Sequence, residues 1–320
     1  MVSDPSRDCL VITGPTASGK TGVAIDVAQN LGGEIISLDS RQVYQGMDIG
    51  TAKATPAQRA AVPHHGLDLL LPSERYNAGR FADDARAWIS DIKRRGRIPI
   101  LVGGTGFFLR ALTHPMFREP PLDADRKEAL KQLLNRKSRP ELLDWLRHLD
   151  PVGAAGLSSE AGRQRIARMI EVVLLTGRPI HWWHAQGAEG AQQPIAALTI
   201  VLTLDRATLY ARINQRVVEM VENGLAEEVA RLLASGYDDN TPGMKTTGYI
   251  EMIPYLRGQI SLEEAIDAIQ RATRSFARRQ ITWFRHQLAE PVVELDAAMS
   301  HEALVERIVE EWKRNNAHRN

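Results

Sequence analysis

Eight consecutive residues near the start of the chain have the types and spacing of a phosphate-binding loop. They read Gly14-Pro-Thr-Ala-Ser-Gly19-Lys20-Thr21, which matches the pattern G-x-x-x-x-G-K-[ST]. Glycines let backbone N–H groups curl around an anion, and the N-terminus of the following helix adds a positive dipole. Lys20 adds a point charge, and the Thr21 hydroxyl can hold a Mg²⁺ ion that bridges phosphate oxygens. The motif indicates phosphate or pyrophosphate binding and does not specify ATP.

Polar groups also follow two other apolar runs. Asp39 stands in Leu38-Asp-Ser-Arg-Gln, and Thr105 stands in Gly103-Gly-Thr-Gly. Ligands of open α/β sheets bind beyond the carboxyl ends of the strands, where both segments would lie. Asp39 can serve there as a metal ligand, a general base or a turn residue. Thr105 can bring a hydroxyl toward the phosphates or belong to a simple turn.

Arginines recur at helical spacing in two regions. Arg212 and Arg216 are four residues apart and share a helix face, so they can close over a phosphate or lie in solvent. A later segment, 270–287, places its arginines on one face, without matching acids, and its apolar residues on the other, which we expect to pack. Such a row favours the backbone of RNA or DNA, and the alternative is an ordinary solvated face. The arginines are Arg271, Arg274, Arg278 and Arg285, and the apolar residues are Ile269, Phe276 and Trp283.

The elements that must position these residues alternate between strand and helix. Apolar runs without polar alternation predict buried strands at 9–13, 34–38 and 97–102. Helical patterns occupy 20–31 and 81–94. This order is typical of an α/β fold with a P-loop-containing, doubly wound parallel sheet and right-handed crossovers.

The pattern changes near His114. Amphipathic and charged helices follow, and no strand is predicted before 198–204. We therefore expect a helical insertion at 115–195, with its far boundary in Gly187–Gln193, between two parts of a core at 1–114 and 196–320. A shorter basic set falls in this insertion, at Arg163, Arg165 and Arg168. Beyond the strand the chain reads as helical, at 207–235 and 262–287, and Ser261 and Glu264 form a capping box before the second helix.

Composition restricts the class of protein. The 320 residues carry a formal net charge of +1, so any basic patch must be local. The single cysteine, Cys9, excludes an internal disulfide and is expected to be a buried core thiol. No stretch approaches 18 apolar residues and no secretory h-region is present, so we expect a cytoplasmic protein without a membrane span.

Seven segments together resemble the bacterial tRNA dimethylallyltransferases, also called tRNA isopentenyltransferases or the IPP transferase family. The similar segments follow the family's order and span almost the whole chain. They are GPTASGKT (14–21), LDSRQVYQGMDIGTAK (38–53), RIPILVGGTGFFLRAL (97–112), RQRIARMIEVVLLTGRPI (163–180), LYARINQRVVEMVENGL (209–225), TTGYIEMIPYLRGQIS (246–261) and TRSFARRQITWFR (273–285).

The resemblance implies a specific activity. A dimethylallyl group moves from its pyrophosphate to the exocyclic N6 of the adenosine at tRNA position 37, beside the anticodon, and pyrophosphate is released. The P-loop would hold the pyrophosphate of the donor rather than ATP. The core would resemble P-loop kinases, and the insertion would help to hold the anticodon stem-loop. The implied cofactor is Mg²⁺, the implied partners are tRNA and dimethylallyl pyrophosphate, and we expect a monomer.

Residue roles follow from the same resemblance. Asp39 takes the role of general base or acceptor for the adenine amine, and Thr105 contacts the donor near the reacting centre. Lys20 and Arg216 complete the catalytic set. The donor site would contain Gly14, Pro15, Thr16, Ala17, Ser18, Gly19, Lys20, Thr21 and Arg212, with Thr21 on the metal. The tRNA site would contain Asp39, Ser40, Arg41, Gln42, Gln164, Arg165, Ile166, Ala167, Arg168, Arg271, Arg274 and Arg278.

Two other functions account for part of these features. A P-loop kinase acting on a nucleoside or small metabolite would explain the loop, Asp39 and the arginine pair, and it leaves the basic helix unexplained. A non-catalytic RNA-binding NTPase switch would hydrolyse nucleotide and leave the RNA chemically unchanged. Prenylation of one adenosine in tRNA distinguishes the three.

Overall fold

The computed structural model describes residues 7–114, 123–159, 161–186 and 193–317 of the chain. The chain divides into two compact units. The core unit contains Met1–His114 and Pro194–Asn320, and the insertion unit contains Pro115–Gln193.

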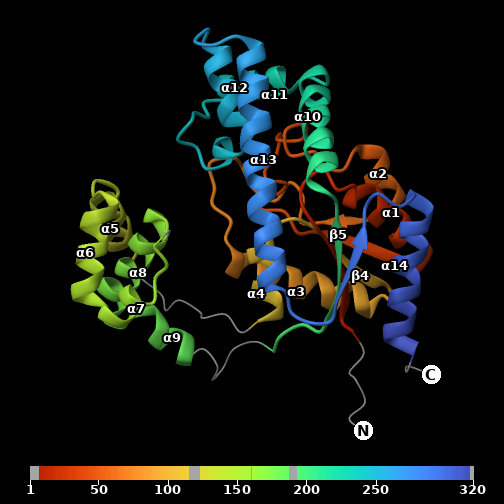
Figure 1. Ribbon diagram of the computed structural model, residues 1–320, viewed down its shortest axis with the longest axis horizontal. Coiled ribbons are helices and arrows are strands. Elements are labelled where there is room, and N and C mark those ends of the chain that lie inside the picture. Colours follow the sequence, from red (N-terminus) through yellow and green to blue (C-terminus); the bar gives the residue numbers. More distant parts are fainter. Residues whose placement is uncertain (1–6, 115–122, 160, 187–192, 318–320) are drawn as a thin grey trace. The chain divides into compact units, whose positions relative to one another are not determined.

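A parallel sheet forms the centre of the core unit (Figure 1). Its strand order is β3-β2-β4-β1-β5-β6, and every neighbouring pair is parallel. The predicted doubly wound sheet is therefore confirmed. The strands are β1 (Cys9–Thr13), β2 (Gly33–Ser37), β3 (His64–His65), β4 (Ile98–Gly103), β5 (Ala197–Thr203) and β6 (Val292–Asp296).

Helices enclose this sheet on both sides. Helices α1 (Lys20–Leu31) and α14 (His301–Asn316) share one hydrophobic cluster with residues such as Ile12 and Ile100 of the central strands. Strand residues that point the other way, such as Leu101, are also buried, and α3 (Ala78–Arg94) packs against β2 and β4. Burial on both faces explains why the strands read as uninterrupted apolar runs.

A second hydrophobic cluster joins most of the remaining helices of the core unit. It includes Tyr44, Met47 and Tyr249, all fully or almost fully buried. The remaining helices and short turns are α2 (Pro56–Ala61), α4 (Gly106–Thr113), α10 (Arg206–Glu222), α11 (Leu225–Ala234), η1 (Gly243–Lys245), α12 (Tyr249–Leu256) and α13 (Leu262–Gln287), and all of them except α2 and α4 contribute residues to this cluster. Helix α13 begins with the predicted Ser261 and Glu264 capping box.

Two predictions for the second half of the core unit were wrong. The single helix expected over 207–235 is broken at Gly224, which has φ 97°, a left-handed value that favours glycine. The chain after α13 is not purely helical, because β6 adds an edge strand beside β5. β6 is short and largely accessible to solvent. Its sequence therefore lacks the apolar run that marks the central strands.

The insertion unit is helical throughout its described residues. Leu142, Leu146, Ile166 and Ile170 form its core. Its helices are α5 (Ala124–Asn135), α6 (Arg139–Leu149), α7 (Pro151–Ala155), α8 (Arg163–Thr176) and α9 (Ile180–Gln186). Of the predicted boundary Gly187–Gln193, residues 187–192 lie outside the described residues.

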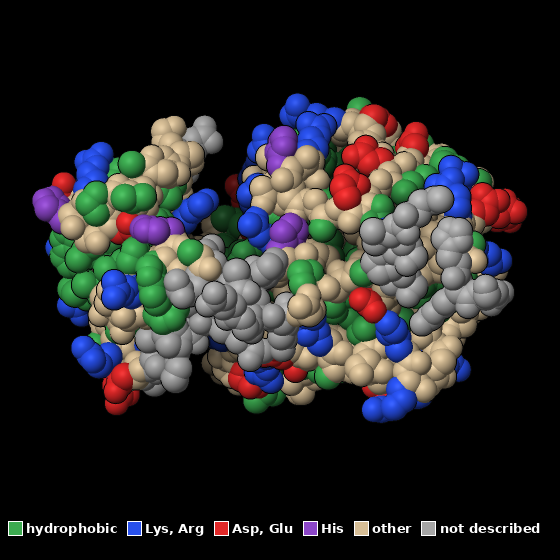
Figure 2. Space-filling view, turned by 90° about the horizontal axis from the view of Figure 1, so that it is seen from below, with side chains coloured by type: hydrophobic (Ala, Val, Ile, Leu, Met, Phe, Trp, Pro, Cys, Tyr) green, Lys and Arg blue, Asp and Glu red, His purple; other side chains and the backbone are tan. Residues whose placement is uncertain are grey.

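The surface of the core unit carries both signs of charge on the face shown in Figure 2. This fits the near-neutral net charge and means that an anion site must come from local geometry. None of the helices in the described ranges combines the length and the apolar composition that crossing a bilayer demands.

Candidate functional site

The predicted phosphate loop lies between β1 and α1, at the carboxyl end of the sheet. Its backbone adopts positive φ angles at Gly14 (144°), Ala17 (64°) and Gly19 (87°). A Cβ on Gly14 would lie 2.4 Å from the carbonyl oxygen of Leu202 on β5, so only glycine fits there. Lys20 is the first residue of α1, and its Nζ donates to the Pro15 carbonyl oxygen at 2.7 Å.

Three charged groups face one another beside this loop. Burial, helped by the nearby charge of Arg216 and opposed by that of Asp39, lowers the pKa of Lys20 to about 7. Burial also lowers the pKa of Arg216 and raises the pKa of Asp39. Within the described ranges, no carboxylate oxygen lies within ion-pair distance of the Lys20 amine or the Arg216 guanidinium. Two desolvated cations without a counterion favour binding of an anion.

A pocket gathers most of the predicted catalytic groups. Its lining includes Thr16, Lys20, Thr21, Asp39, Gln42, Gly103, Gly104, Arg216, Phe276 and Gln280. An adjoining open pocket of about 880 Å³ shares Lys20, Thr21 and Arg216 with it and extends past Lys53 and Arg59. The cations therefore lie where the two pockets meet, and Asp39 lies on one side of them.

Asp39 and Thr105 lie in adjacent loops because β2 and β4 are hydrogen-bonded neighbours. The Thr105 Oγ1 accepts from the Ser40 N–H at 3.1 Å, and the Thr105 N–H donates to the Leu38 carbonyl oxygen at 3.1 Å. The Arg41 N–H donates to the Asp39 Oδ1 at 2.8 Å, which holds the carboxylate at the strand end. A turn-forming role for Asp39 thus coexists with its place in the pocket.

Helix α13 closes the pocket through a residue that sequence reasoning missed. The Gln280 Oε1 accepts from the Thr16 N–H at 2.9 Å, and its Nε2 donates to the Gly104 carbonyl oxygen at 2.9 Å. Gln280 thereby ties the phosphate loop to the loop after β4. A Cβ on Gly104 would lie 2.2 Å from the Gln280 Nε2, and one on Gly106 would lie 2.2 Å from Trp283. The available signal was a polar residue at the spacing of Trp283, on the face expected to pack.

The arginine pair on α10 separates into two environments. Arg216 lines both pockets, whereas Arg212 is exposed and donates to the Ala297 carbonyl oxygen at 3.3 Å. Helical spacing correctly gave the two residues a similar direction, but one turn of helix carries Arg212 past the pocket.

The basic face of α13 is less uniform than its spacing predicts. Arg271 has an acid one turn away, since its Nη1 lies 3.6 Å from Asp267. Arg274 donates to the Asn214 Oδ1 at 2.6 Å, so it joins α13 to α10. Arg278 is exposed. Phe276 was predicted to pack, but its side chain is 39% exposed and lines the pocket.

The remaining predicted RNA-contacting residues divide between surface and interior. Gln164 and Arg165 are exposed on α8, Ala167 is half-buried, and Arg168 lies 3.0 Å from Glu171. Ile166 is fully buried in the insertion core, so its side chain serves packing. Arg163 is also committed internally, donating to the carbonyl oxygens of Lys137 and Leu134.

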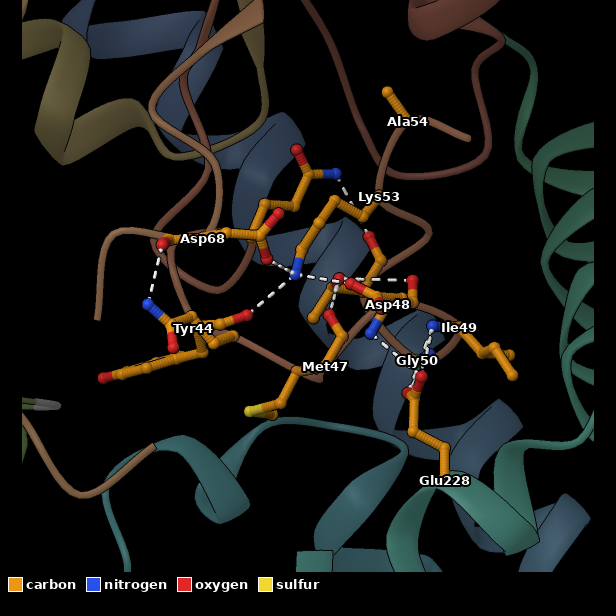
Figure 3. A network of polar contacts seen from close by, with 12 residues as sticks. Tyr44, Met47, Asp48, Ile49, Gly50, Lys53, Ala54, Asp68 and Glu228 are labelled. Carbon is orange, nitrogen blue, oxygen red and sulfur yellow. Dashed lines mark hydrogen bonds and ion pairs between the residues drawn. The ribbon is translucent and has the colours of Figure 1, made fainter. Parts of the chain in front are cut away.

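One wall of the pocket is a turn spanning residues 47–54, drawn in Figure 3. The side chain of Lys53 is fully buried, and its Nζ lies 2.7 Å from Asp48, 2.6 Å from Asp68 and 2.7 Å from the Tyr44 carbonyl oxygen. On its other side, the turn rests on the buried carboxylate of Glu228. These internal contacts fix the backbone at Thr51 and Ala52, which face the pocket.

Known proteins share both the sequence and the fold of this chain. A tRNA dimethylallyltransferase of Carboxydothermus hydrogenoformans is 43% identical over 97% of this chain and 99% of its own length. A protein of the same name from Thermotoga maritima is 43% identical over 86% of this chain and 88% of its own. The crystal structure of a tRNA isopentenylpyrophosphate transferase from Bacillus halodurans is 37% identical, with a TM-score of 0.69 over 98% of this chain and 100% of that one.

Two family models also match this chain. The model described as isopentenyl transferase matches residues 7–62, which hold the phosphate loop and Asp39. The model described as IPP transferase matches residues 42–287, well over half of the sequence. The resemblance drawn from the seven segments is confirmed, and the chain belongs to the IPP transferase family.

Proposed function

We propose that this protein transfers a dimethylallyl group from dimethylallyl pyrophosphate to N6 of adenosine 37 in tRNA and releases pyrophosphate. One observation carries the proposal. One pocket combines two partly desolvated cations, Lys20 and Arg216, which have no ion-pair partner among the described residues, with the half-buried carboxylate of Asp39. An anionic leaving group and a nucleophile that must lose a proton require that combination. The names of the relatives support the same activity.

Asp39 acts on the nucleophile. The adenine amine is weakly nucleophilic because its lone pair is delocalised into the ring, so attack needs a proton acceptor. As the N6–C1 bond forms, the C1–O bond to pyrophosphate breaks and the N6 proton passes to the Asp39 carboxylate. Burial raises the pKa of Asp39, which makes the carboxylate a stronger base than one in solvent. Thr105, hydrogen-bonded to the neighbouring Ser40 N–H, borders the reacting centre.

The phosphate loop acts on the leaving group. Lys20, Arg216 and the backbone N–H groups of Gly19–Thr21 at the start of α1 meet the charge that grows on the pyrophosphate oxygens. Among the described residues, no cluster of acids, histidines or cysteines could hold a metal by itself. A Mg²⁺ ion at this pocket would therefore be held mainly by substrate and water, and the exposed Thr21 hydroxyl would be its protein ligand. When bound, that ion would neutralise pyrophosphate charge.

The tRNA must bring its adenine base into the pocket from the surface of the protein. Adenosine 37 has to leave the stack of the anticodon loop to reach Asp39. Arg278 and Arg271 on α13, with Gln164 and Arg165 on the insertion unit, are exposed and suited to hold the RNA backbone. We propose that the protein acts as a monomer. The kinase alternative has no support among the relatives.

The test is mass spectrometry of tRNA incubated with the protein, Mg²⁺ and dimethylallyl pyrophosphate. We expect one prenyl mass gain, located at adenosine 37. Asp39→Ala should retain tRNA affinity and lose about 10²–10⁴-fold in turnover, the usual contribution of a general base. Glu222→Ala, on an exposed site at the end of α10, is the control. Wild-type turnover in Asp39→Ala would disprove the assignment of the base, and ATP consumption without tRNA would favour a kinase.

A further inference from the structure

The turn at 47–54 is held by a carboxylate from a distant helix (Figure 3). Glu228 of α11 is 2% exposed and accepts the backbone N–H groups of three consecutive residues, Asp48, Ile49 and Gly50, at 3.0–3.2 Å. The Tyr249 hydroxyl donates to the same carboxylate at 2.5 Å. Four donors thus satisfy one buried charge, and no cation is needed.

The anchored turn also holds Gln42, a residue that lines the pocket. The carbonyl oxygens of Thr51 and Ala52 accept from the Gln42 Nε2 at 3.2 and 3.3 Å. The Gln42 Oε1 accepts from the Ser37 hydroxyl at 2.8 Å. Gln42 lines the pocket and directly follows Arg41, whose backbone N–H donates to the Asp39 Oδ1 at 2.8 Å. Hydrogen bonds therefore lead from Glu228 through the turn to Gln42, and the peptide bond from Gln42 to Arg41 leads on to the group that holds Asp39.

We propose that Glu228 is a positioning residue for the transfer reaction, acting through the 47–54 turn and Gln42 to fix the place of Asp39. The inference rests on the proposed function. Glu228 lines neither pocket, so its effect on the reaction has to pass through the turn. The turn packs closely against Tyr249, because a Cβ on Gly50 would lie 2.3 Å from the Tyr249 ring.

The geometry predicts which kinetic constant changes. Lys20 and Arg216, which would hold the donor pyrophosphate, take no part in the described hydrogen bonds between Glu228, the turn and Gln42, so the KM for dimethylallyl pyrophosphate should stay near the wild-type value. The position of Asp39 relative to the base should change, which lowers kcat. A misplacement of about 1 Å can cost about 10²-fold in rate.

The experiment uses Glu228→Gln, which keeps the size of the side chain and replaces one acceptor oxygen by a donor. The control is Glu227→Gln, the exposed neighbour on α11. Activity is measured well below the melting temperature of each variant, together with hydrogen exchange of the 48–50 amides. We expect Glu228→Gln to lower kcat about 10–100-fold with unchanged KM for the donor and faster exchange of those amides. Glu227→Gln should match the wild type.

A double variant distinguishes positioning from general damage. If Glu228 acts through Gln42, Gln42→Ala combined with Glu228→Gln should be no slower than the slower single variant. Losses that multiply would overturn the proposal, as would wild-type kcat or unchanged amide exchange in Glu228→Gln. If Glu228→Gln does not fold, Tyr249→Phe removes one of the four donors, and we expect a smaller loss that is again non-additive with Gln42→Ala. A wild-type protein that forms no prenylated tRNA would refute the reaction itself, and the exchange result would still decide whether Glu228 anchors the turn.

Discussion

Two lysines line the same open pocket, and their surroundings are opposite. The Lys53 amine lies within 2.7 Å of the carboxylates of Asp48 and Asp68, so its charge is neutralised inside the fold. Among the described residues, the Lys20 amine donates hydrogen bonds only to uncharged oxygens, those of Pro15 and Ser18. A buried charge with internal partners stabilises the wall of a site, whereas a buried charge without them creates affinity for a ligand. The sequence motif marks Lys20 as a phosphate-binding residue. The structural role of Lys53 follows only from its ion-pair partners.

Replacing Lys20 should produce the largest loss of activity. We expect Lys20→Met to lower kcat/KM about 10³-fold, because the growing pyrophosphate charge loses its nearest cation. The free energy of unfolding should not fall, since the side chain that is removed carries an uncompensated charge. Steady-state kinetics and chemical denaturation measure the two quantities. A large loss of stability in Lys20→Met would contradict the difference in role between Lys20 and Lys53.

Replacing Lys53 should instead destabilise the fold. Lys53→Met removes the buried cation that Asp48 and Asp68 share, while Asp68 keeps its ion pair with Arg59, and losing such charged hydrogen bonds costs about 1.5–3 kcal/mol. Denaturant unfolding gives the free energy, and the control is Lys245→Met on an exposed site. An unchanged unfolding midpoint would contradict the structural role of Lys53.

The two arginines of α10 repeat the comparison on a smaller scale. Arg216→Ala should raise the KM for dimethylallyl pyrophosphate and lower kcat, with a combined loss of about 10²-fold. Arg212→Ala should stay within about twofold of the wild type, because an exposed side chain outside the pocket is changed. Equal effects of the two substitutions would mean that α10 presents both residues to the donor.

The smallest expected effect is an uptake of protons. Lys20 has a pKa of about 7 in the folded protein, so the amine is mostly neutral at about pH 8. A bound pyrophosphate raises that pKa, and the amine takes up a proton. Calorimetry in two buffers of different ionisation enthalpy should detect this uptake, and Lys20→Met should lose it. Without ligand, the unfolded state binds more protons than the folded state above pH 7, so the contribution of Lys20 to stability should rise with pH from about 7 to 10.5.

The central elements were predictable because burial on both faces leaves a strong sequence signal. Helix α1 occupies the predicted residues, and β1, β2 and β4 lie within one residue of their predicted ends. Edge strand β6 and the break at Gly224 were missed, because their sequences resemble the amphipathic segments around them. Element ends give weak local signals.

The site was predictable where a motif fixes the backbone and obscure where packing decides. The phosphate loop places Lys20 without help from other elements, whereas Gln280 matters because α13 crosses two loops that are distant in sequence. Glu228 gave no signal, since the donors that it binds lie about 180 residues earlier. Spacing along a helix predicts a face, but the neighbour of that face comes from the rest of the fold.

The chain leaves the core unit and returns to it at a single point. The Ile195 N–H donates to the Leu112 carbonyl oxygen at 2.9 Å, so the two ends of the intervening segment are fastened together beside α4. A segment attached in this way can be lengthened, shortened or exchanged with little entropic cost to the sheet. The segment between Leu112 and Ile195 can therefore change in length or sequence during evolution while the parallel sheet and its phosphate loop stay constant.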